Sequence, residues 1–306
     1  MKFDVGVPSG AIKHFESWVG EGDMHDFAIA AEAAGFDSVH VTDHPFPEDS
    51  WLGTGGHQAF DPFVALSCMA AVTTAIRLRT NLLVAGYRNP YLMARSIASL
   101  DRLSHGRMIA GMGAGYLEAE FDVLGADFSR RGRLFDEALD AMADAWTGES
   151  VDRPDGAFPA RGHTMAPPPV QSPGPPIWIG GNSRAAKRRA VERADGWIPM
   201  PTTPVLARIT GTDELDSVEQ LATEIAELSE QREAGGRPGP FDVAFSAFGL
   251  PSPADDPTGE QMREVIRSHA DVGVSWLSLP CRGRSLGACQ DELAWWGEHV
   301  IGPLRV

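Results

Sequence analysis

The chain has 306 residues, of which 43% are hydrophobic and 22% charged, a composition typical of globular rather than disordered proteins. Its formal net charge of −16 repels phosphodiester backbones and anionic lipids, which argues against nucleic acid and membrane surfaces as partners. No stretch approaches the roughly 20 apolar residues of a membrane span, and the first residues lack the apolar core of a signal peptide. Three cysteines without metal-ligand spacing indicate a reducing compartment, so we expect a cytoplasmic protein.

Strand and helix patterns alternate along the first half of the chain. Short apolar or β-branched runs predict strands at 3–7, 38–42, 78–84 and 108–112. Helices are expected after each strand: from Asp23 to Gly35, from Asp61-Pro62, from Asn89-Pro90 to Gly106, and within 128–146. An acidic or amide side chain followed by proline is typical of a helix start, and a glycine just past the apolar stripe is typical of its end.

A proline-rich segment then interrupts the alternation. Eight prolines between 148 and 176 exclude a helix or a central strand there. The segment is either an interdomain linker or a surface insertion, and the alternation that resumes directly after it favours an insertion. Strands are predicted at 177–180, 196–200, 241–248 and 274–279, with helices between them and one at the end. Thr258 and Gln261 have the spacing of a capping box.

Eight strands, each followed by a helix, require parallel pairing with right-handed crossovers. Eight such units in about 250 to 300 residues predict an α/β fold, a (β/α)8 TIM barrel with a proline-rich insertion between the fourth helix and the fifth strand. We expect one domain over residues 1–306. An open doubly wound sheet is the alternative architecture.

Asp43 and His44 end the second predicted strand, where parallel α/β folds place their chemistry. Histidine titrates near neutral pH and can give or take a proton, while Asp43 can orient it or bind a polar ring edge. A lone histidine is more often structural, but this position makes the two residues catalytic candidates. Four aromatic residues at strand tips or loops are candidates for an apolar substrate pocket, although any single tryptophan is more often core: Trp51, Tyr87, Tyr116 and Trp197.

Two glycine turns mark places where the backbone can approach a ligand closely. Gly113-Ala114-Gly115 follows the fourth strand, but Tyr116 stands where a dinucleotide fingerprint needs its third glycine. Gly180-Gly181-Asn182-Ser183 opens a helix with basic residues in its first turns, which indicates an anionic group such as phosphate; the alternative is a capped helix with a solvated charged face. The histidines form no zinc motif, so no metal is expected.

Taken together, these stretches resemble the luciferase-like monooxygenase superfamily, and within it the coenzyme F420-dependent oxidoreductase branch. The similarity extends over nearly the whole chain and is weakest in the last two strands. The segments that carry it are 41–44, 89–90 with 100–107, 111–118, 133–146 and 175–181.

The resemblance implies a deazaflavin across the carboxyl-terminal face of the barrel and, usually, a homodimer. It places Asp43 and His44 near the ring, with His44 as proton donor or acceptor, and a non-proline cis peptide at Asn81-Leu82 behind it. Gly113 and Ala114 then contact the cofactor. Gly180, Gly181 and Asn182 bind its phosphate through their backbone N–H groups, and Ser183 belongs to the same cofactor-binding turn. One sugar-phosphate dehydrogenase subgroup has a catalytic glutamate where this chain has Tyr116, so that chemistry is not supported.

The leading hypothesis is therefore hydride transfer between reduced F420 and an apolar small molecule. A two-component monooxygenase that uses reduced FMN and oxygen has the same fold and is the first alternative. A catalytically silent flavin-binding accessory protein is the second.

Overall fold

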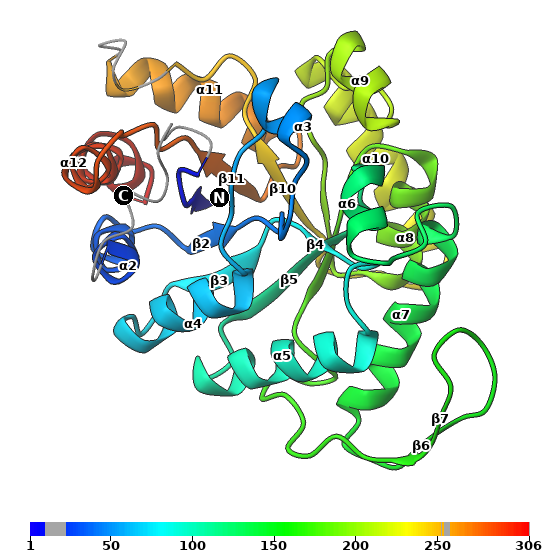
Figure 1. The fold of residues 1–306 in the computed structure, drawn as a ribbon. Coiled ribbons are helices and arrows are strands. Elements are labelled where there is room, and N and C mark those ends of the chain that lie inside the picture. The colour runs from blue at the N-terminus through cyan, green and yellow to red at the C-terminus, as the bar shows by residue number, and fades with distance from the viewer. Residues whose placement is uncertain (10–22, 252, 254–257, 306) are drawn as a thin grey trace.

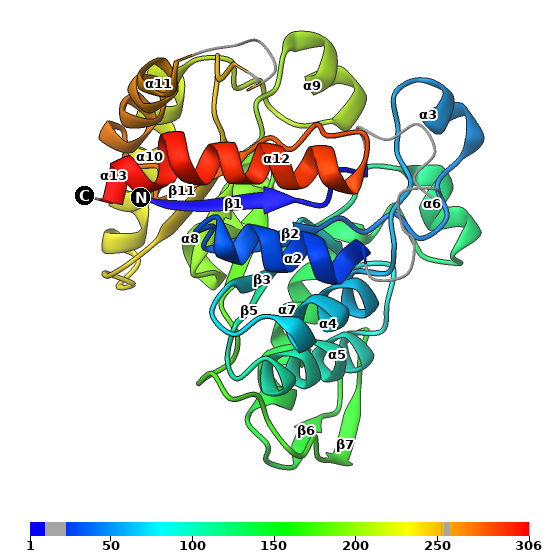
Figure 2. The same cartoon turned by 90° about the vertical axis from the view of Figure 1, so that its left-hand side faces the viewer.

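The computed structural model describes residues 1–9, 23–251, 253 and 258–305. Eight strands of this part of the chain close into a parallel barrel, surrounded by helices (Figure 1, Figure 2). In chain order they are β1 (Lys2–Gly6), β2 (Ser38–Val41), β3 (Arg77–Thr80), β5 (Met108–Gly113), β8 (Ile177–Gly180), β9 (Gly196–Ile198), β10 (Asp242–Ser246) and β11 (Trp276–Leu279). The pairing of β3 with β5 and of β1 with β11 completes the ring, which confirms the predicted TIM barrel and excludes the open sheet.

Most of the main helices begin at a residue whose side chain caps them. They are α2 (Asp23–Ala33), α4 (Pro62–Val72), α5 (Pro90–Leu103), α7 (Arg131–Trp146), α8 (Arg184–Arg193), α10 (Val218–Ala234), α11 (Gly259–Asp271) and α12 (Leu286–Trp296). The Asp61 carboxylate accepts hydrogen bonds from the first amides of α4, and Thr258 and Gln261 form the predicted capping box of α11. A π-helical turn, Gly297–Ile301, and α13 (Gly302–Arg305) follow α12. None of the helices in the described ranges has the length and apolar character needed to span a bilayer.

The structure differs from the predicted elements at several connections. The third predicted strand is split, because β3 ends at Thr80 and the cis peptide Asn81-Leu82 separates it from β4 (Leu83–Val84). Three short helices were not predicted: α3 (Asp49–Gly53), α6 (Glu118–Val123) and α9 (Pro204–Thr210). The proline-rich segment contains a small antiparallel hairpin, β6 (Val151–Arg153) with β7 (Ala160–His163), which adds no strand to the barrel.

The barrel interior combines an apolar layer with a buried charged cluster. Ile109, Trp178, Ala244 and Trp276 pack together, and the Arg79 guanidinium lies 5.6 Å from the Trp178 ring. Other interior contacts are polar: Arg79 pairs with Asp4, and His40 Nδ1 lies 3.2 Å from an Asp4 carboxylate oxygen. Burial lowers the pKa of Arg79 to about 9 and that of His40 to about 4.

This interior cluster reaches the rim of the barrel. Arg79 Nη1 donates to Asn81 Oδ1 at 3.1 Å, and Asn81 is the first residue of the cis peptide. Because all barrel strands are parallel, the segments after β2, β3, β5 and β8 meet at the same rim. The predicted site residues lie on these segments, except Trp197, which lies within β9.

Candidate active site

A cavity of about 380 Å³ opens at the carboxyl-terminal rim. It is lined by residues that follow β2, β3, β5, β8 and β9, and therefore lies where enzymes of this fold carry their chemistry. The lining includes most of the predicted site residues: Asp43, His44, Asn81, Leu82, Gly113, Ala114, Tyr116, Gly180, Gly181 and Ser183.

The cis peptide bond between Asn81 and Leu82 forms part of the cavity wall. The Leu82 side chain reaches across to β5 and β8, where it packs on Gly113 and Gly180. A Cβ atom built on Gly180 would overlap the Leu82 side chain, and one on Gly113 would stand 3.1 Å from Leu82 Cδ1. Glycine at these two positions therefore makes room for Leu82.

The turn after β8 and the start of α8 form the second end of the cavity. Gly181 has φ of +104°, a conformation that favours glycine. Its N–H donates to Ile198 O, and the Asn182 N–H donates to Thr212 Oγ1, so these amides do not point at an anion as expected. The buried Asn182 side chain bonds the backbone of Met200 and thus shapes the turn.

The backbone amides that remain for an anion are those of Ser183, Arg184 and Ala185. None of these N–H groups has a hydrogen bond within the described residues, and Ser183 caps α8 by accepting from Ala186 N. Arg131 also lines this cavity; its guanidinium bonds Gly115 O and Phe128 O and has no carboxylate within 4.0 Å among the described residues. A helix N-terminus and a guanidinium without a carboxylate partner, both lining one cavity, fit a phosphate group.

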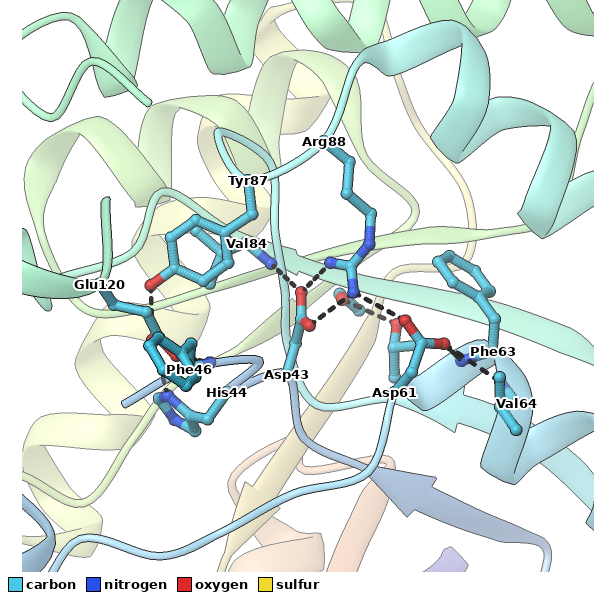
Figure 3. Close-up of polar contacts among 12 residues, drawn as sticks. Asp43, His44, Phe46, Asp61, Phe63, Val64, Val84, Tyr87, Arg88 and Glu120 are labelled. Carbon is cyan, nitrogen blue, oxygen red and sulfur yellow. Dashed lines mark hydrogen bonds and ion pairs between the residues drawn. The ribbon is translucent and has the colours of Figure 1, made fainter. Parts of the chain in front are cut away.

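Asp43 and His44 point away from one another, as Figure 3 shows. The Asp43 carboxylate is buried and forms two hydrogen bonds with Arg88, at 2.5 and 2.9 Å, and a third with the Val84 N–H. Burial raises the pKa of Asp43, and Arg88 opposes this shift. Burial alone would lower the pKa of Arg88, but the Asp43 bond and charge outweigh it and raise that pKa. Asp43 therefore does not orient His44.

The carboxylate that orients His44 is Glu120, from α6. Glu120 Oε2 lies 3.1 Å from His44 Nδ1 and accepts from the Tyr87 hydroxyl at 2.8 Å, while Oε1 accepts from the Phe46 N–H at 3.0 Å (Figure 3). Burial alone would raise the pKa of Glu120, but these three hydrogen bonds outweigh it and lower that pKa. An ionised carboxylate accepts only, so His44 Nδ1 carries the proton and Nε2 remains for a ligand.

The four aromatic candidates occupy different environments. Tyr116 lines the cavity, and Trp51 packs on His44 with ring centroids 4.6 Å apart. Tyr87 lies behind the histidine, where its hydroxyl bonds Glu120 and its ring packs on Phe121. Trp197 is fully buried and its indole N–H donates to Gly181 O, so it supports the wall from the core instead of lining it.

Four residues of this cavity or its immediate support were not predicted as site residues: Glu120, Arg88, Arg131 and His57. Glu120 lies 76 residues from His44 and Arg88 lies 45 residues from Asp43, so no local spacing links either pair. His57, in the loop after α3, lines the cavity, with its ring centroid 5.1 Å from that of His44. The available signal was that a buried aspartate and an oriented histidine each require a polar or charged partner.

Comparison with known proteins places the chain in a family. The model of the luciferase-like monooxygenase family matches residues 11–277. The chain belongs to this family. An F420-dependent glucose-6-phosphate dehydrogenase of Nakamurella multipartita is 31% identical in an alignment 331 positions long. The alignment covers 94% of this chain and 93% of that protein.

Solved structures of low sequence identity share the fold. The monooxygenase RslO1 from Streptomyces bottropensis superimposes with a TM-score of 0.80 at 20% identity, over 100% of both chains. The coenzyme F420-dependent tetrahydromethanopterin reductase from Methanopyrus kandleri gives 0.71 at 15% identity, over 99% of both chains. These likenesses confirm the luciferase-like barrel and, at such identities, nothing further about the reaction.

Proposed function

We propose that the protein is a coenzyme F420-dependent oxidoreductase in which His44 transfers a proton at the reacting oxygen of a small-molecule substrate. The observation that carries the proposal is His44 itself: it lines the rim cavity beside the cis peptide, with Nδ1 held by Glu120 and Nε2 left for the substrate. The relative from Nakamurella multipartita, named as F420-dependent and aligned over almost the whole chain, supports the choice of cofactor.

The residues present fit a phosphate-bearing flavin or deazaflavin. We propose that Asn81-Leu82 and the Gly113-Ala114 turn bear its ring system, with the Asp43–Arg88 pair beside it. The turn from Gly180 through Asn182 shapes the phosphate end, where Ser183, the following amides and Arg131 face the phosphate. When bound, the deazaflavin supplies a carbon that accepts or donates hydride.

The protein's own groups handle the proton. In the direction of alcohol oxidation, the substrate hydroxyl loses its proton to His44 Nε2 as its carbon loses hydride, and a carbonyl forms. In the reverse direction, protonated His44 returns the proton to the carbonyl oxygen. Glu120 stabilises the imidazolium in both directions, because its ionised carboxylate lies 3.1 Å from Nδ1.

Cofactor titration tests the proposal first. We expect F420 to bind tightly, as measured by fluorescence, and reduced F420 to exchange hydride with members of a panel of alcohols and carbonyls. Tight binding of FMN without a response to F420 would overturn the proposal in favour of the monooxygenase.

A His44→Ala variant then tests the role of the imidazole. General acid–base catalysis contributes about 10²–10⁴-fold to turnover, so we expect a loss of this size with the cofactor dissociation constant changed less than about threefold. His163→Ala, at an exposed position of β7, is the matched control. A silent binding protein would lose nothing in either variant.

We further propose that the protein is a homodimer formed through α4 and α5. These helices lie side by side on the outside of the barrel (Figure 1, Figure 2). They expose Val64, Leu92 and Leu103, each more than 60% accessible. Light scattering should give the mass of two chains, and Leu92→Glu should give one; a monomeric parent protein would contradict this assembly.

Finally, we propose that the protein works in the cytoplasm. Cys68 and Cys281 are free thiols, and the thiol of Cys289 donates a hydrogen bond to Gly283 O, which fits a reducing compartment. Cell fractionation tests this, and recovery outside the cytoplasmic fraction would contradict it.

A further inference from the structure

A second imidazole, His57, shares the cavity with His44, and nothing in the proposed proton transfer uses it. The His44 and His57 rings meet edge to face, with centroids 5.1 Å apart and planes at 85°. Trp51 packs against both rings, at 4.6 Å from His44 and 5.5 Å from His57. The three rings form a cluster, of which His44 and His57 line the cavity.

The loop that carries Trp51 and His57 is built around this cluster. The Gly56 N–H and the Thr54 N–H both donate to Trp51 O, at 2.9 and 3.1 Å, so the chain folds back over the tryptophan after α3. A Cβ atom on Gly56 would overlap the Trp51 indole. Glycine at this position therefore allows the next residue, His57, to lie against the indole and His44.

The hydrogen bonds of His57 fix which ring nitrogen faces a ligand. Nδ1 lies 3.2 Å from Gln58 O, a backbone carbonyl that only accepts, so Nδ1 carries a proton. A second contact of Nδ1, with Ser9 Oγ, is 3.4 Å long. Within the described residues Nε2 has no hydrogen bond. Burial lowers the pKa of His57 and outweighs the hydrogen bond to Gln58 O, which raises it; the charges of His44 and Glu120 act in opposite directions. At neutral pH His57 is therefore an uncharged ring whose Nε2 accepts and does not donate.

We propose that His57 is a substrate-binding residue whose Nε2 accepts a hydrogen bond from a hydroxyl group next to the reacting carbon. This inference rests on the proposed function, because it takes the reacting carbon to be the one beside His44. The wall of the cavity is otherwise largely apolar, with Tyr116, Leu82 and Phe135 among its residues. The substrate class is then a small, mainly apolar molecule with a hydroxyl adjacent to its alcohol or carbonyl, such as a vicinal diol or a hydroxyketone.

Propane-1,2-diol and propan-2-ol are the probes, because they share the secondary alcohol and differ by the neighbouring hydroxyl. With oxidised F420, we expect kcat/KM of the parent protein to be roughly tenfold higher for the diol. A ratio of this size is typical of one hydrogen bond between a substrate hydroxyl and a buried acceptor. His57→Phe keeps a ring against Trp51 but removes the acceptor, so the ratio of the two kcat/KM values should fall to about one. His163→Phe, on the exposed hairpin, should leave the ratio unchanged.

Binding provides a readout that does not depend on turnover. The ¹⁵N spectrum of the parent protein, assigned by difference with His57→Phe, should show a His57 ring protonated at Nδ1 only. The diol should shift its Nε2 resonance at a lower concentration than the monoalcohol, with or without F420. Absence of F420 turnover together with this selective shift would contradict the proposed function alone. Equal shifts from both probes, or a His57 ring protonated at Nε2, would overturn the role of His57.

Discussion

Replacing Glu120 with glutamine should change the tautomer of His44 and thereby stop proton transfer. Glu120 Oε2 accepts from both His44 Nδ1 and the Tyr87 hydroxyl, whereas Oε1 accepts from the Phe46 N–H, which can only donate. A glutamine therefore satisfies all its neighbours when its oxygen faces Phe46 and its NH₂ faces His44 and Tyr87. His44 Nδ1 must then accept, so the proton of the neutral ring moves to Nε2 and the base that faces the substrate is lost.

The expected loss of turnover follows from that change. A misplaced imidazole proton removes general acid–base catalysis, which is worth about 10²–10⁴-fold, or about 3–5 kcal/mol of activation free energy. Loss of charged hydrogen bonds at a residue that is 1% exposed should also lower the free energy of unfolding by about 1–3 kcal/mol.

The pH dependence of that stability has a definite sign. The folded-state pKa of Glu120 is lowered from its ordinary 4.5, so its contribution is fully present above pH 4.5 and is lost as the pH falls through the lower folded value. The gap between parent and Glu120→Gln should therefore close in acid.

Stopped-flow hydride transfer, denaturant unfolding at several pH values and ¹⁵N spectra of His44 together measure these effects. Glu118→Gln makes the same chemical change at an exposed position of the same helix and is the control. If Glu120→Gln turns over within twofold of the parent protein, or if His44 keeps its proton on Nδ1, the carboxylate does not orient the histidine and the reasoning fails.

Three further predictions concern the frame of the site. Gly180→Ala should force Leu82 away from β8, lower the free energy of unfolding by about 1–3 kcal/mol and weaken cofactor binding. Gly287→Ala is the control, because Gly287 has open space around it, and it should have none of these effects. Equal melting temperatures for the two variants would contradict this packing. Arg88→Met removes the cationic partner of the buried Asp43 and should lower the free energy of unfolding, measured with denaturant at pH 7, by about 3 kcal/mol. The double variant with Asp43→Asn should regain most of this stability. If it does not, the charge of Asp43 is not the cause of the loss. Burial lowers the pKa of His40 from an ordinary 6.5 to about 4, which predicts that the free energy of unfolding falls by about 3 kcal/mol as the pH drops from 6.5 to 4. Urea unfolding at several pH values measures this fall, and an equally steep fall in a His40→Gln variant would refute the prediction.

The barrel follows from the sequence because its signals are local and repeated. The starts of α4 and α5 are encoded by Asp61-Pro62 and Asn89-Pro90, and the structure shows both caps in place. The run from 78 to 84 is apolar enough to predict one strand. A pattern of apolar residues does not show whether a peptide bond is cis or trans. The cis bond at Asn81-Leu82, which divides the strand, was therefore expected only from the family resemblance.

Two of the short helices, α3 and α6, were not predicted for the opposite reason, since neither begins with a side-chain cap. α6 has six residues and no side-chain cap, and Leu117 stands at its N-cap position. α3 has five residues in a glycine-rich loop, where Trp51 packs directly against Gly56. Both helices matter to the site, because α6 supplies Glu120 and the α3 loop supplies His57. A pattern that finds the long helices of the frame is therefore least informative about the segments that complete the chemistry.

Asp43 and His44 are adjacent in sequence but bond different partners, so adjacency in sequence does not imply that two side chains interact. Consecutive side chains of an extended chain point to opposite sides. An acid directly before a catalytic histidine at a strand end therefore cannot easily bond its ring, and the orienting carboxylate must come from another segment. In this structure Asp43 turns to Arg88, 45 residues on, and His44 turns to Glu120, 76 residues on. The same rule, applied to other parallel barrels with an Asp-His pair at a strand tip, predicts two distinct partners, one cationic and one anionic, on the neighbouring loops of the rim.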